Sequence, residues 1–359
     1  MVTISLCMIV RNEEDVLARC LDCVRGIADE VVVVDTGSSD ATKEIAKRYT
    51  DRIYDFPWID DFAAARNFSF DRAVMEYILW LDADDILLPP DQKAFLALKQ
   101  SLDPSVDMVM MPYHVAFDSQ GRPTMTYARE RLLRRAYGYR WAGAVHEAIA
   151  PAGKILHAPI AVTHRKLRPG DADRNLRIFE KMRAQGQPLD PRQQFYYARE
   201  LLYHARYQEA IRALTGFLDS GRGWVENNIS ACQDLAVCYQ ATAEPEKALA
   251  ALCRSFRYDA PRAEVLCAIG QYFLDRAQYP SAVFWYQAAA AQTPRETGGF
   301  LSPDCYNFLP YLQLCVCYDR LGDRRTAMAY HEKAAQCKPD HPSVLYNAAY
   351  FAKRQQAEQ

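Results

Sequence analysis

The chain has 359 residues, a length that predicts about two domains. Half of the residues are apolar and a quarter are charged, which excludes a disordered, collagen-like or simple coiled-coil protein. Lys and Arg number 43 against 45 Asp and Glu, so the formal net charge of −2 does not predict binding to nucleic acid or to an anionic membrane. No apolar run approaches the ~20 residues that span a bilayer, so no transmembrane segment is expected.

The eleven cysteines are scattered, and most lie in apolar helical patterns. They are too sparse for a disulfide scaffold, so we interpret them as reduced core thiols of a cytoplasmic protein. Cys20 and Cys23 have the spacing of metal ligands, but they lie in the middle of a predicted amphipathic helix with no second pair nearby, which argues against zinc. The first five residues show no basic segment followed by an apolar stretch, so secretion is not expected.

Residues 1–170 alternate short apolar runs with amphipathic helices, the pattern of an α/β domain with a mixed, mostly parallel sheet. The β-branched run at Ile4–Val10 is typical of a strand buried on both faces. Further strands are predicted over Glu30–Val34, Arg52–Tyr54, Tyr77–Leu81, Asp107–Phe117, Met125–Leu133 and Ile160–Thr163. Helices are predicted over Glu14–Arg25, over Asp40–Tyr49 with Ser38, Ser39 or Asp40 as the cap, over Phe62–Val74, and from Pro89 onward.

Residues 192–359 are helical and repeated, and residues 171–191 are expected to form a linker or helical flap. Small residues that allow two helices to approach closely recur at Ala210, Ala248, Ala282 and Ala327, with spacings of 38, 34 and 45 residues. The apolar and aromatic residues around them follow the tetratricopeptide pattern, which predicts a solenoid of about four repeats. The longest spacing contains an insertion near residues 295–308. This half by itself indicates an interaction module.

An acidic run, Asp82-Ala83-Asp84-Asp85, follows directly after the predicted strand YILWL. Carboxylates there emerge at the carboxyl end of a strand, where open α/β sheets bind ligands. Acids packed so closely repel one another unless a cation joins them, and a hard divalent cation can also bridge a diphosphate. The alternative is an acidic turn that caps the helix after Pro89-Pro90.

Asp35 ends the second predicted strand in the same way and is followed by Thr36-Gly37-Ser38. An acid at a strand end can bind a ribose or a base edge, and these small residues would let the backbone approach a ligand closely. The alternative is an ordinary strand–turn–helix. Asp35 together with the acidic run at residues 82–85 favours a ligand site.

Four motifs in order, MIVRNEE (8–14), VVVVDTGSSDAT (31–42), ARN (65–67) and LDADD (81–85), resemble the family 2 glycosyltransferases with a GT-A (Rossmann-like) domain. The resemblance implies a nucleotide-diphosphate-sugar donor, favours a UDP-sugar such as UDP-glucose or UDP-N-acetylglucosamine, and implies a Mn²⁺ or Mg²⁺ ion and inversion at the anomeric carbon. With repeats after the domain, the layout is similar to the sublancin-type peptide S-glycosyltransferases.

The resemblance also implies roles for individual residues. Val10 and Arg11 would line the uracil pocket, and Asp35 would contact the nucleoside. Arg66 would lie near the nucleotide. In the acidic run, Asp82 and Ala83 would contact the nucleotide, Asp84 would hold the metal, and Asp85 would touch the metal or the sugar.

The acceptor needs a general base, because an inverting transfer removes its proton as the nucleophile attacks. Glu147, in the run WAGAVHE, is the candidate, with His146 as the alternative or as a partner that orients it. Many family 2 enzymes carry the base in an E-D or D-D pair after the sheet, and this chain has no such pair at that place. The alternative is a surface carboxylate beside a packed histidine.

His164 follows a predicted strand and is a candidate further metal ligand, although a lone histidine is more often structural. Basic residues after it would form a flap over the diphosphate or a solvated linker, namely Arg165, Lys166, Arg168 and Arg174. Before the ARN motif, Asp60 or Asp61 is expected to cap a helix, and stacking of Trp58 on a ligand is left open.

Three functions follow as hypotheses. The leading one is an inverting, metal-dependent glycosyltransferase whose repeats dock a peptide or protein acceptor for modification of a Cys, Ser or Thr side chain. In the second, the acceptor is an envelope saccharide or lipid-linked sugar, and the repeats make a homodimer or tether the enzyme. The third is a scaffold with an inert domain, against which the retained acids argue.

Overall fold

The computed structural model describes residues 1–118, 120–167, 170–295 and 297–357. It divides the chain into two compact units, unit 1 (Met1–Leu189) and unit 2 (Asp190–Gln359). The predicted linker therefore falls mostly in unit 1, where α5 (Arg174–Ala184) forms. Phe179 of α5 is buried, and Lys181 pairs with Asp60 at 2.5 Å, which explains why this helix belongs to the first unit.

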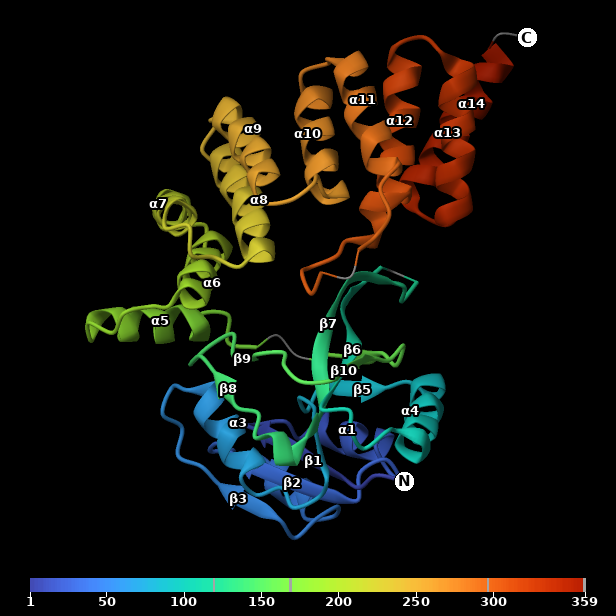
Figure 1. The fold of residues 1–359 in the computed structure, drawn as a ribbon. Helices are drawn as coiled ribbons and strands as arrows, with labels where there is room; N and C mark the ends of the chain where they lie inside the picture. The colour runs from blue at the N-terminus through green and yellow to red at the C-terminus, as the bar shows by residue number, and fades with distance from the viewer. Residues whose placement is uncertain (119, 168–169, 296, 358–359) are drawn as a thin grey trace. The chain divides into compact units, whose positions relative to one another are not determined.

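Unit 1 is built on one large sheet with the strand order β3-β2-β1-β4-β7-β6-β11-β5, and β10 pairs with β6 (Figure 1). Four parallel strands form its first half: β1 (Ile4–Val10), β2 (Glu30–Asp35), β3 (Ile53–Asp55) and β4 (Tyr77–Trp80). β1 lies between β2 and β4, so its continuous apolar sequence is buried, as predicted.

The second half of the sheet makes it mixed. The predicted pair of long strands forms the antiparallel hairpin of β6 (Met108–Phe117) and β7 (Pro123–Arg134), and β7 also pairs antiparallel with β4. Ser119 of its predicted turn lies outside the described residues. The remaining strands are β5 (Asp85–Leu87), β10 (Ile155–His157), β11 (Val162–His164) and the small pair β8 (Trp141–Ala142) and β9 (Ala148–Ile149).

The helices of unit 1 are shorter than predicted at the N-terminal end of the chain. They are α1 (Leu17–Cys23), α2 (Thr42–Ala46), α3 (Phe62–Phe70) and α4 (Pro89–Ser101). α1 begins late because the N–H groups of Glu13 and Glu14 donate to the side chains of Thr42 and Asp40 and leave the helical pattern. Asp61 caps α3 by accepting from the Ala64 N–H, and α4 begins at Pro89; both features were predicted.

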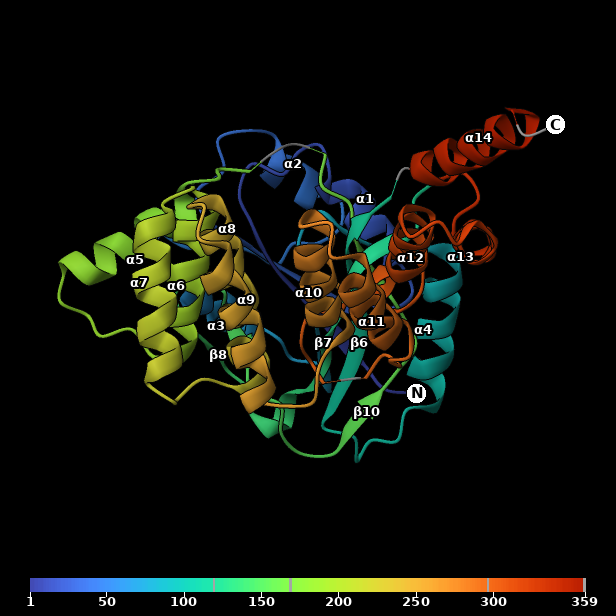
Figure 2. The same cartoon turned by 90° about the horizontal axis from the view of Figure 1, so that it is seen from above.

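The long elements of unit 2 that the structure describes are α-helices, which follow one another as pairs (Figure 2). Ala210, Ala248, Ala282 and Ala327 are fully buried between paired helices, which confirms the predicted helical solenoid. The helices are α6 (Pro191–Tyr203), α7 (Tyr207–Asp219), α8 (Val225–Ala241), α9 (Pro245–Arg254), α10 (Ala263–Asp275), α11 (Tyr279–Ala290), α12 (Phe308–Arg320), α13 (Arg324–Cys337) and α14 (Pro342–Ala357).

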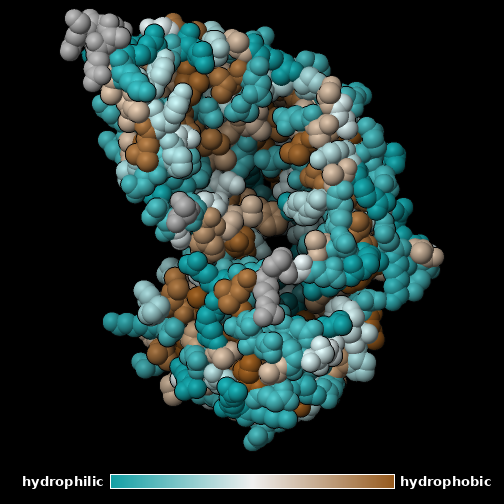
Figure 3. All heavy atoms as spheres, turned by 180° about the vertical axis from the view of Figure 1, so that it is seen from behind, coloured by the Kyte–Doolittle hydropathy of each residue, from teal (hydrophilic) through white to brown (hydrophobic). Residues whose placement is uncertain are grey.

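Two expectations about the whole chain can be checked. Among the described residues, no helix has both the length and the apolar character required to cross a membrane. On the face drawn in Figure 3, hydrophobic residues are interspersed in small groups among hydrophilic ones. All eleven cysteines lie in the described part of the chain and are free thiols there.

Candidate functional site

The predicted acids lie where parallel strands end together. Val10, the last residue of β1, is in register with Asp35, the last residue of β2. Asp82 follows two residues after the end of β4, which pairs with β1 on its other side. Because these strands run in the same direction, the motifs at their carboxyl ends meet at one edge of the sheet.

Asp35 is a buried acid with one oxygen in use. Its Oδ1 accepts the backbone N–H groups of Gly37 and Ser38 at 2.9 and 2.8 Å. Its Oδ2 is buried and has no hydrogen-bond partner among the described residues, although the residue is only 2% exposed. A buried carboxylate oxygen without a partner is unfavourable, so this atom has unused hydrogen-bonding capacity. Beside it, Val10 is buried and Arg11 is exposed.

Two loops at this edge are fastened together by hydrogen bonds. Asn12 adopts a left-handed backbone conformation (φ 55°), and its Oδ1 accepts the Ser39 N–H at 2.8 Å. Its own N–H donates to Ser38 Oγ at 2.9 Å, and the Glu13 N–H donates to Thr42 Oγ1 at 2.7 Å. The prediction that Ser38, Ser39 or Asp40 caps α2 is wrong, because Ala41 is at the N-cap and no side chain caps the helix. These residues instead hold the loop after β1 against the loop after β2, and Asp40 also accepts the Thr42 N–H at 3.0 Å.

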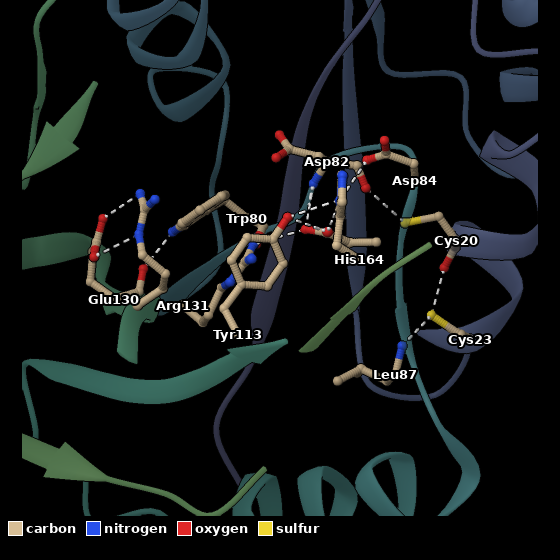
Figure 4. Close-up of polar contacts among 12 residues, drawn as sticks. Cys20, Cys23, Trp80, Asp82, Asp84, Leu87, Tyr113, Glu130, Arg131 and His164 are labelled. Atoms are coloured by element: carbon tan, nitrogen blue, oxygen red, sulfur yellow. Dashed lines mark hydrogen bonds and ion pairs between the residues drawn. The ribbon is translucent and has the colours of Figure 1, made fainter. Parts of the chain in front are cut away.

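Asp84, Asp85 and His164 form a cluster at the same edge (Figure 4). The Oδ1 atoms of Asp84 and Asp85 each lie 3.3 Å from His164 Nδ1, and one donor atom from each residue lies within 4.8 Å of the others. Two carboxylates and an imidazole are a donor set that suits Mn²⁺. The structure thus brings together Asp84 and His164, the two predicted metal ligands.

The two acids determine the protonation of His164. Burial by itself would lower the pKa of this imidazole, but hydrogen bonds to Asp84 and Asp85 outweigh burial and raise the pKa to about 10. The charged imidazole neutralises part of the acid cluster. Because an imidazole ligand must be neutral, metal binding would release that proton.

Asp85 is held from behind by a network that the sequence did not indicate. Its side chain is fully buried, its Oδ1 accepts the Tyr113 hydroxyl at 2.8 Å, and its Oδ2 lies 3.1 Å from Arg131 Nη1. The Arg131 guanidinium lies over the rings of Trp80 and Tyr113, at 3.9 and 4.3 Å from their centroids. With both oxygens in use inside the protein, Asp85 is poorly placed to reach a sugar, and its contact with a metal stays a prediction.

Arg66 of α3 joins two predicted site residues. Its Nη2 lies 2.7 Å from Asp82 Oδ1 and its Nε 2.6 Å from Glu147 Oε1. The guanidinium is nearly buried and lies over Trp141, 4.9 Å from the ring centroid. Burial alone would raise the pKa of Asp82, but the positive charge of Arg66 overcomes this and lowers it to about 2. Arg66 therefore keeps Asp82 ionised and links it to the candidate base.

The candidate base lies on a constrained loop. Its neighbour His146 has a left-handed backbone (φ 51°), which is uncommon for a residue other than glycine. The His146 ring stacks on Phe179 of α5 with 6.5 Å between centroids. The Glu147 carboxylate itself is held by its ion pair with Arg66. The catalytic roles of Glu147 and His146 stay predictions.

The ARN motif has a clear local explanation. Arg66 makes the ion pairs just described, and Ala65 is fully buried. Asn67 grips the backbone of Trp141: its Nδ2 donates to the carbonyl at 3.0 Å, and its Oδ1 accepts the N–H at 2.9 Å. The motif therefore fixes the chain that leads from β8 into the Glu147 loop.

The other sequence candidates have structural partners. The Trp58 indole N–H donates to Asp60 at 2.9 Å, and Ala83 is buried. The guanidinium groups of Arg165 and Arg174 lie over the rings of Phe117 and Phe62, at 4.7 and 4.5 Å. Arg168 lies outside the described residues. The thiols of Cys20 and Cys23 donate to the carbonyls of Asp82 and Cys20 at 3.4 and 3.0 Å (Figure 4), which agrees with a structural role.

Sequence reasoning missed Glu13, Tyr113 and Arg131. Glu13 is half-buried, and burial together with the charges of Asp84 and Asp82 raises its pKa to about 7. The available signal for Glu13 was its place in the MIVRNEE motif, and for Arg131 it was the charged run ARER inside a predicted strand.

Residues 5–153 match the sequence pattern of a known family, Glycosyl transferase family 2. The match covers less than half of the chain. A TPR repeat-containing protein of Synechococcus elongatus is 37% identical over 154 residues, which cover 42% of this chain and 36% of that protein. The glycosyltransferase SunS of Bacillus subtilis is 28% identical over 231 residues, which cover 58% of this chain and 51% of SunS.

A third relative is the lipopolysaccharide core biosynthesis glycosyltransferase LpsC of Rhizobium meliloti, 28% identical over 167 residues that cover 43% of this chain and 60% of LpsC. The first two relatives are matched over about a third and a half of their own lengths, respectively. The residues that match the family model thus lie in unit 1 and include the four motifs, and the resemblance that these motifs carry is confirmed.

Proposed function

We propose that this protein is an inverting glycosyltransferase that moves a sugar from a nucleotide-diphosphate donor, with a UDP-sugar such as UDP-glucose or UDP-N-acetylglucosamine as the expected donor. The observation that carries the proposal is the edge of the sheet in unit 1. There the unpartnered Oδ2 of Asp35 lies at the carboxyl end of β2, and the cluster of Asp84, Asp85 and His164 is formed by the segment after β4 and by the carboxyl end of β11. The family 2 domain supports it.

We assign nucleoside binding and metal binding to different residues of the site. Asp35, with Val10 and Arg11, would bind the nucleoside. Asp82, which Arg66 holds in an ion pair, would also bind it. Asp84 and His164 would hold Mn²⁺ or Mg²⁺, which when bound supplies positive charge to the leaving diphosphate.

The transfer itself is a single displacement. The acceptor nucleophile bonds to the anomeric carbon while the bond from that carbon to the diphosphate oxygen breaks, and the electron pair leaves with the nucleotide. The acceptor proton passes to a carboxylate, for which Glu147 is our candidate, with His146 beside it. An acceptor thiol would need less help from the base than a hydroxyl would, because its pKa is lower.

The proposed acceptor is a peptide or protein side chain docked by unit 2. The all-helical repeats and the resemblance to peptide S-glycosyltransferases support this choice. A saccharide acceptor is the second candidate, favoured by the likeness to LpsC, a lipopolysaccharide core biosynthesis enzyme. The free cysteines suit a reducing compartment, so we include a cytoplasmic location in the proposal.

The test is release of nucleotide from a panel of UDP- and GDP-sugars with Mn²⁺, using the full chain. Asp84→Asn removes a metal-ligand charge with little change in shape and should lower metal-dependent release about 100-fold or more, because the diphosphate loses its counter-charge. Asp51→Asn, at an exposed acid in the turn before β3, is the matched control and should behave as wild type.

A binding measurement completes this test. At 100 times its dissociation constant, UDP with Mn²⁺ should stabilise the folded protein by about 2.7 kcal/mol. If no donor is turned over and UDP with Mn²⁺ leaves the melting temperature unchanged, the proposal is wrong and the inert-scaffold hypothesis gains.

A further inference from the structure

The insertion between the last two repeats follows an unusual course within unit 2. It connects α11 to α12, and residues 297–306 contact helices of earlier repeats. We call this stretch the return segment. Its contacts reach α10, the start of α8 and then α6, which are the first helices of three preceding pairs. A connection that merely spanned the gap between α11 and α12 would make none of these contacts.

The C-terminal end of the return segment is anchored to a single acid on α10. The Ser302 N–H donates to Glu264 Oε1 at 2.9 Å, and the Tyr306 hydroxyl lies 3.2 Å from Glu264 Oε2. The Cys267 thiol, one turn further along α10, lies 3.5 Å from the Cys305 carbonyl. These contacts hold residues 302–306 against α10, so the part before them is directed back toward α8.

Two glycines let the return segment lie against the start of α8. Gly298 has φ +78°, and a Cβ there would lie 3.5 Å from the Trp224 ring. A Cβ on Gly299 would lie 2.4 Å from Glu226 Oε2, a carboxylate that Arg262 holds at 2.6 Å. A side chain at position 299 would therefore displace the Glu226 carboxylate from its place beside Arg262, whereas glycine lets the segment lie against it.

The next residue, Phe300, places its ring on Arg199 of α6. The Arg199 guanidinium lies 5.0 Å from the centroid of Phe300, and it also lies near the rings of Phe195 and Tyr203, at 5.5 and 5.4 Å. On its other side, Arg199 Nε is 3.1 Å from Asp234 Oδ2 of α8. Phe300 is 38% exposed, and a cation–π contact at a partly exposed site is weak.

We propose that Arg199, with Asp234 and the rings around it, is a binding position for an aromatic side chain of an extended polypeptide, and that Phe300 occupies it when no such polypeptide is bound. The partner that fits carries small residues directly before its aromatic residue, as Gly298-Gly299-Phe300 do, because it meets the same Trp224 and Glu226. The inference rests on the proposed function only in taking this polypeptide to be the acceptor.

The probe is a fluorescein-labelled peptide with the sequence of residues 297–303, Thr-Gly-Gly-Phe-Leu-Ser-Pro. Fluorescence polarisation measures its binding to the full chain and to Phe300→Ala. A tethered segment competes at a high effective concentration, so Phe300→Ala should bind the probe at least about tenfold more tightly than wild type. Phe284→Ala, which removes a 62%-exposed phenylalanine from α11, is the matched control and should bind as wild type does.

Two further comparisons make the test decisive. A probe with alanine at the phenylalanine position should bind Phe300→Ala at least about tenfold more weakly, and Phe300→Ala/Arg199→Met should lose the gain in affinity. The inference is wrong if wild type, Phe300→Ala and Phe284→Ala bind the probe equally, or if the double variant keeps the gain while circular dichroism reports an intact helical unit.

Donor turnover separates this inference from the proposed function. If the probe binds as expected but no sugar nucleotide is turned over, the binding position stands and the proposed function fails. If a donor is turned over in an Asp84-dependent way but the probe results fail, the transferase stands and the return segment is only structural.

Discussion

Asp35 and Asp85 are both buried acids at strand ends of unit 1, yet the protein uses them differently. Asp35, at the end of β2, is 2% exposed, and Asp85, at the start of β5, is 0% exposed. One oxygen of Asp35 has no partner among the described residues, whereas both oxygens of Asp85 have partners in Tyr113 and Arg131. Burial alone therefore does not separate the acid that we propose to bind the nucleoside from the acid that supports the fold; what distinguishes Asp35 is its unused hydrogen-bonding capacity.

Because of this difference, we expect loss of the two acids to have different consequences, one for folding and one for ligand binding. The Arg131 charge offsets that of Asp85, which allows Asp85 to lie beside Asp84 in the cluster. Loss of this support should damage folding first. The Oδ2 of Asp35 accepts no hydrogen bond from the described residues, so loss of that oxygen should damage ligand binding first.

The largest effect is expected from Arg131→Met. It leaves the Asp85 charge buried without its counter-ion and should lower the free energy of unfolding by about 3–5 kcal/mol. Urea unfolding measures the change, and hydrogen exchange in β1 and β7 assigns it to unit 1. The control is Arg134→Met on the same strand, where the guanidinium is 43% exposed and pairs with Asp107 near the surface; it should cost well under half as much.

A double variant sharpens this prediction. In Arg131→Met/Asp85→Leu the buried charge is gone as well, so much of the lost stability should return. If Arg131→Met costs no more than Arg134→Met, or if the double variant is the least stable of the set, the supporting role assigned to Arg131 is wrong.

The contrast also explains what the sequence could predict. The strands β1, β2 and β4 and their terminal acids follow from local apolar runs, and parallel pairing brings their ends together without further information. Arg131 becomes a counter-ion only because β7 pairs antiparallel with β4, which places it beneath Trp80. The contact of Phe300 with Arg199 joins residues about a hundred positions apart, and no local pattern encodes it.

A smaller effect, on binding and not on folding, is expected from Asp35→Asn. Its side-chain oxygen can still accept from Gly37 and Ser38, but an amide replaces the unpartnered Oδ2. Loss of a charged acceptor should weaken UDP binding about 10- to 100-fold by calorimetry, since a hydrogen bond to a charged group contributes about 1.5–3 kcal/mol.

Asp55→Asn is the matched control for Asp35→Asn. Asp55 is the in-register neighbour of Asp35 on β3 and pairs with Lys43 at the surface. It should change UDP affinity less than about twofold. Equal losses in the two variants, or an Asp35→Asn protein that unfolds as easily as Arg131→Met, would contradict the assignment of Asp35 to the ligand.

The smallest effect is expected from Asn12→Gly, which tests how the loop around Asp35 is held. Glycine keeps the left-handed backbone of Asn12 but removes the acceptor of the Ser39 N–H. One partly exposed hydrogen bond contributes about 0.5–1 kcal/mol, so UDP affinity should fall about two- to fivefold with Mn²⁺ present. Ser38→Ala removes the other hydrogen bond to Asn12, and a double-mutant cycle by calorimetry measures the coupling of the two. If the effects of the two substitutions on UDP affinity are coupled, the two loops are preorganised as one unit before the nucleotide binds. If the effects are strictly additive and UDP affinity is unchanged, Asp35 alone accounts for the binding at this strand end.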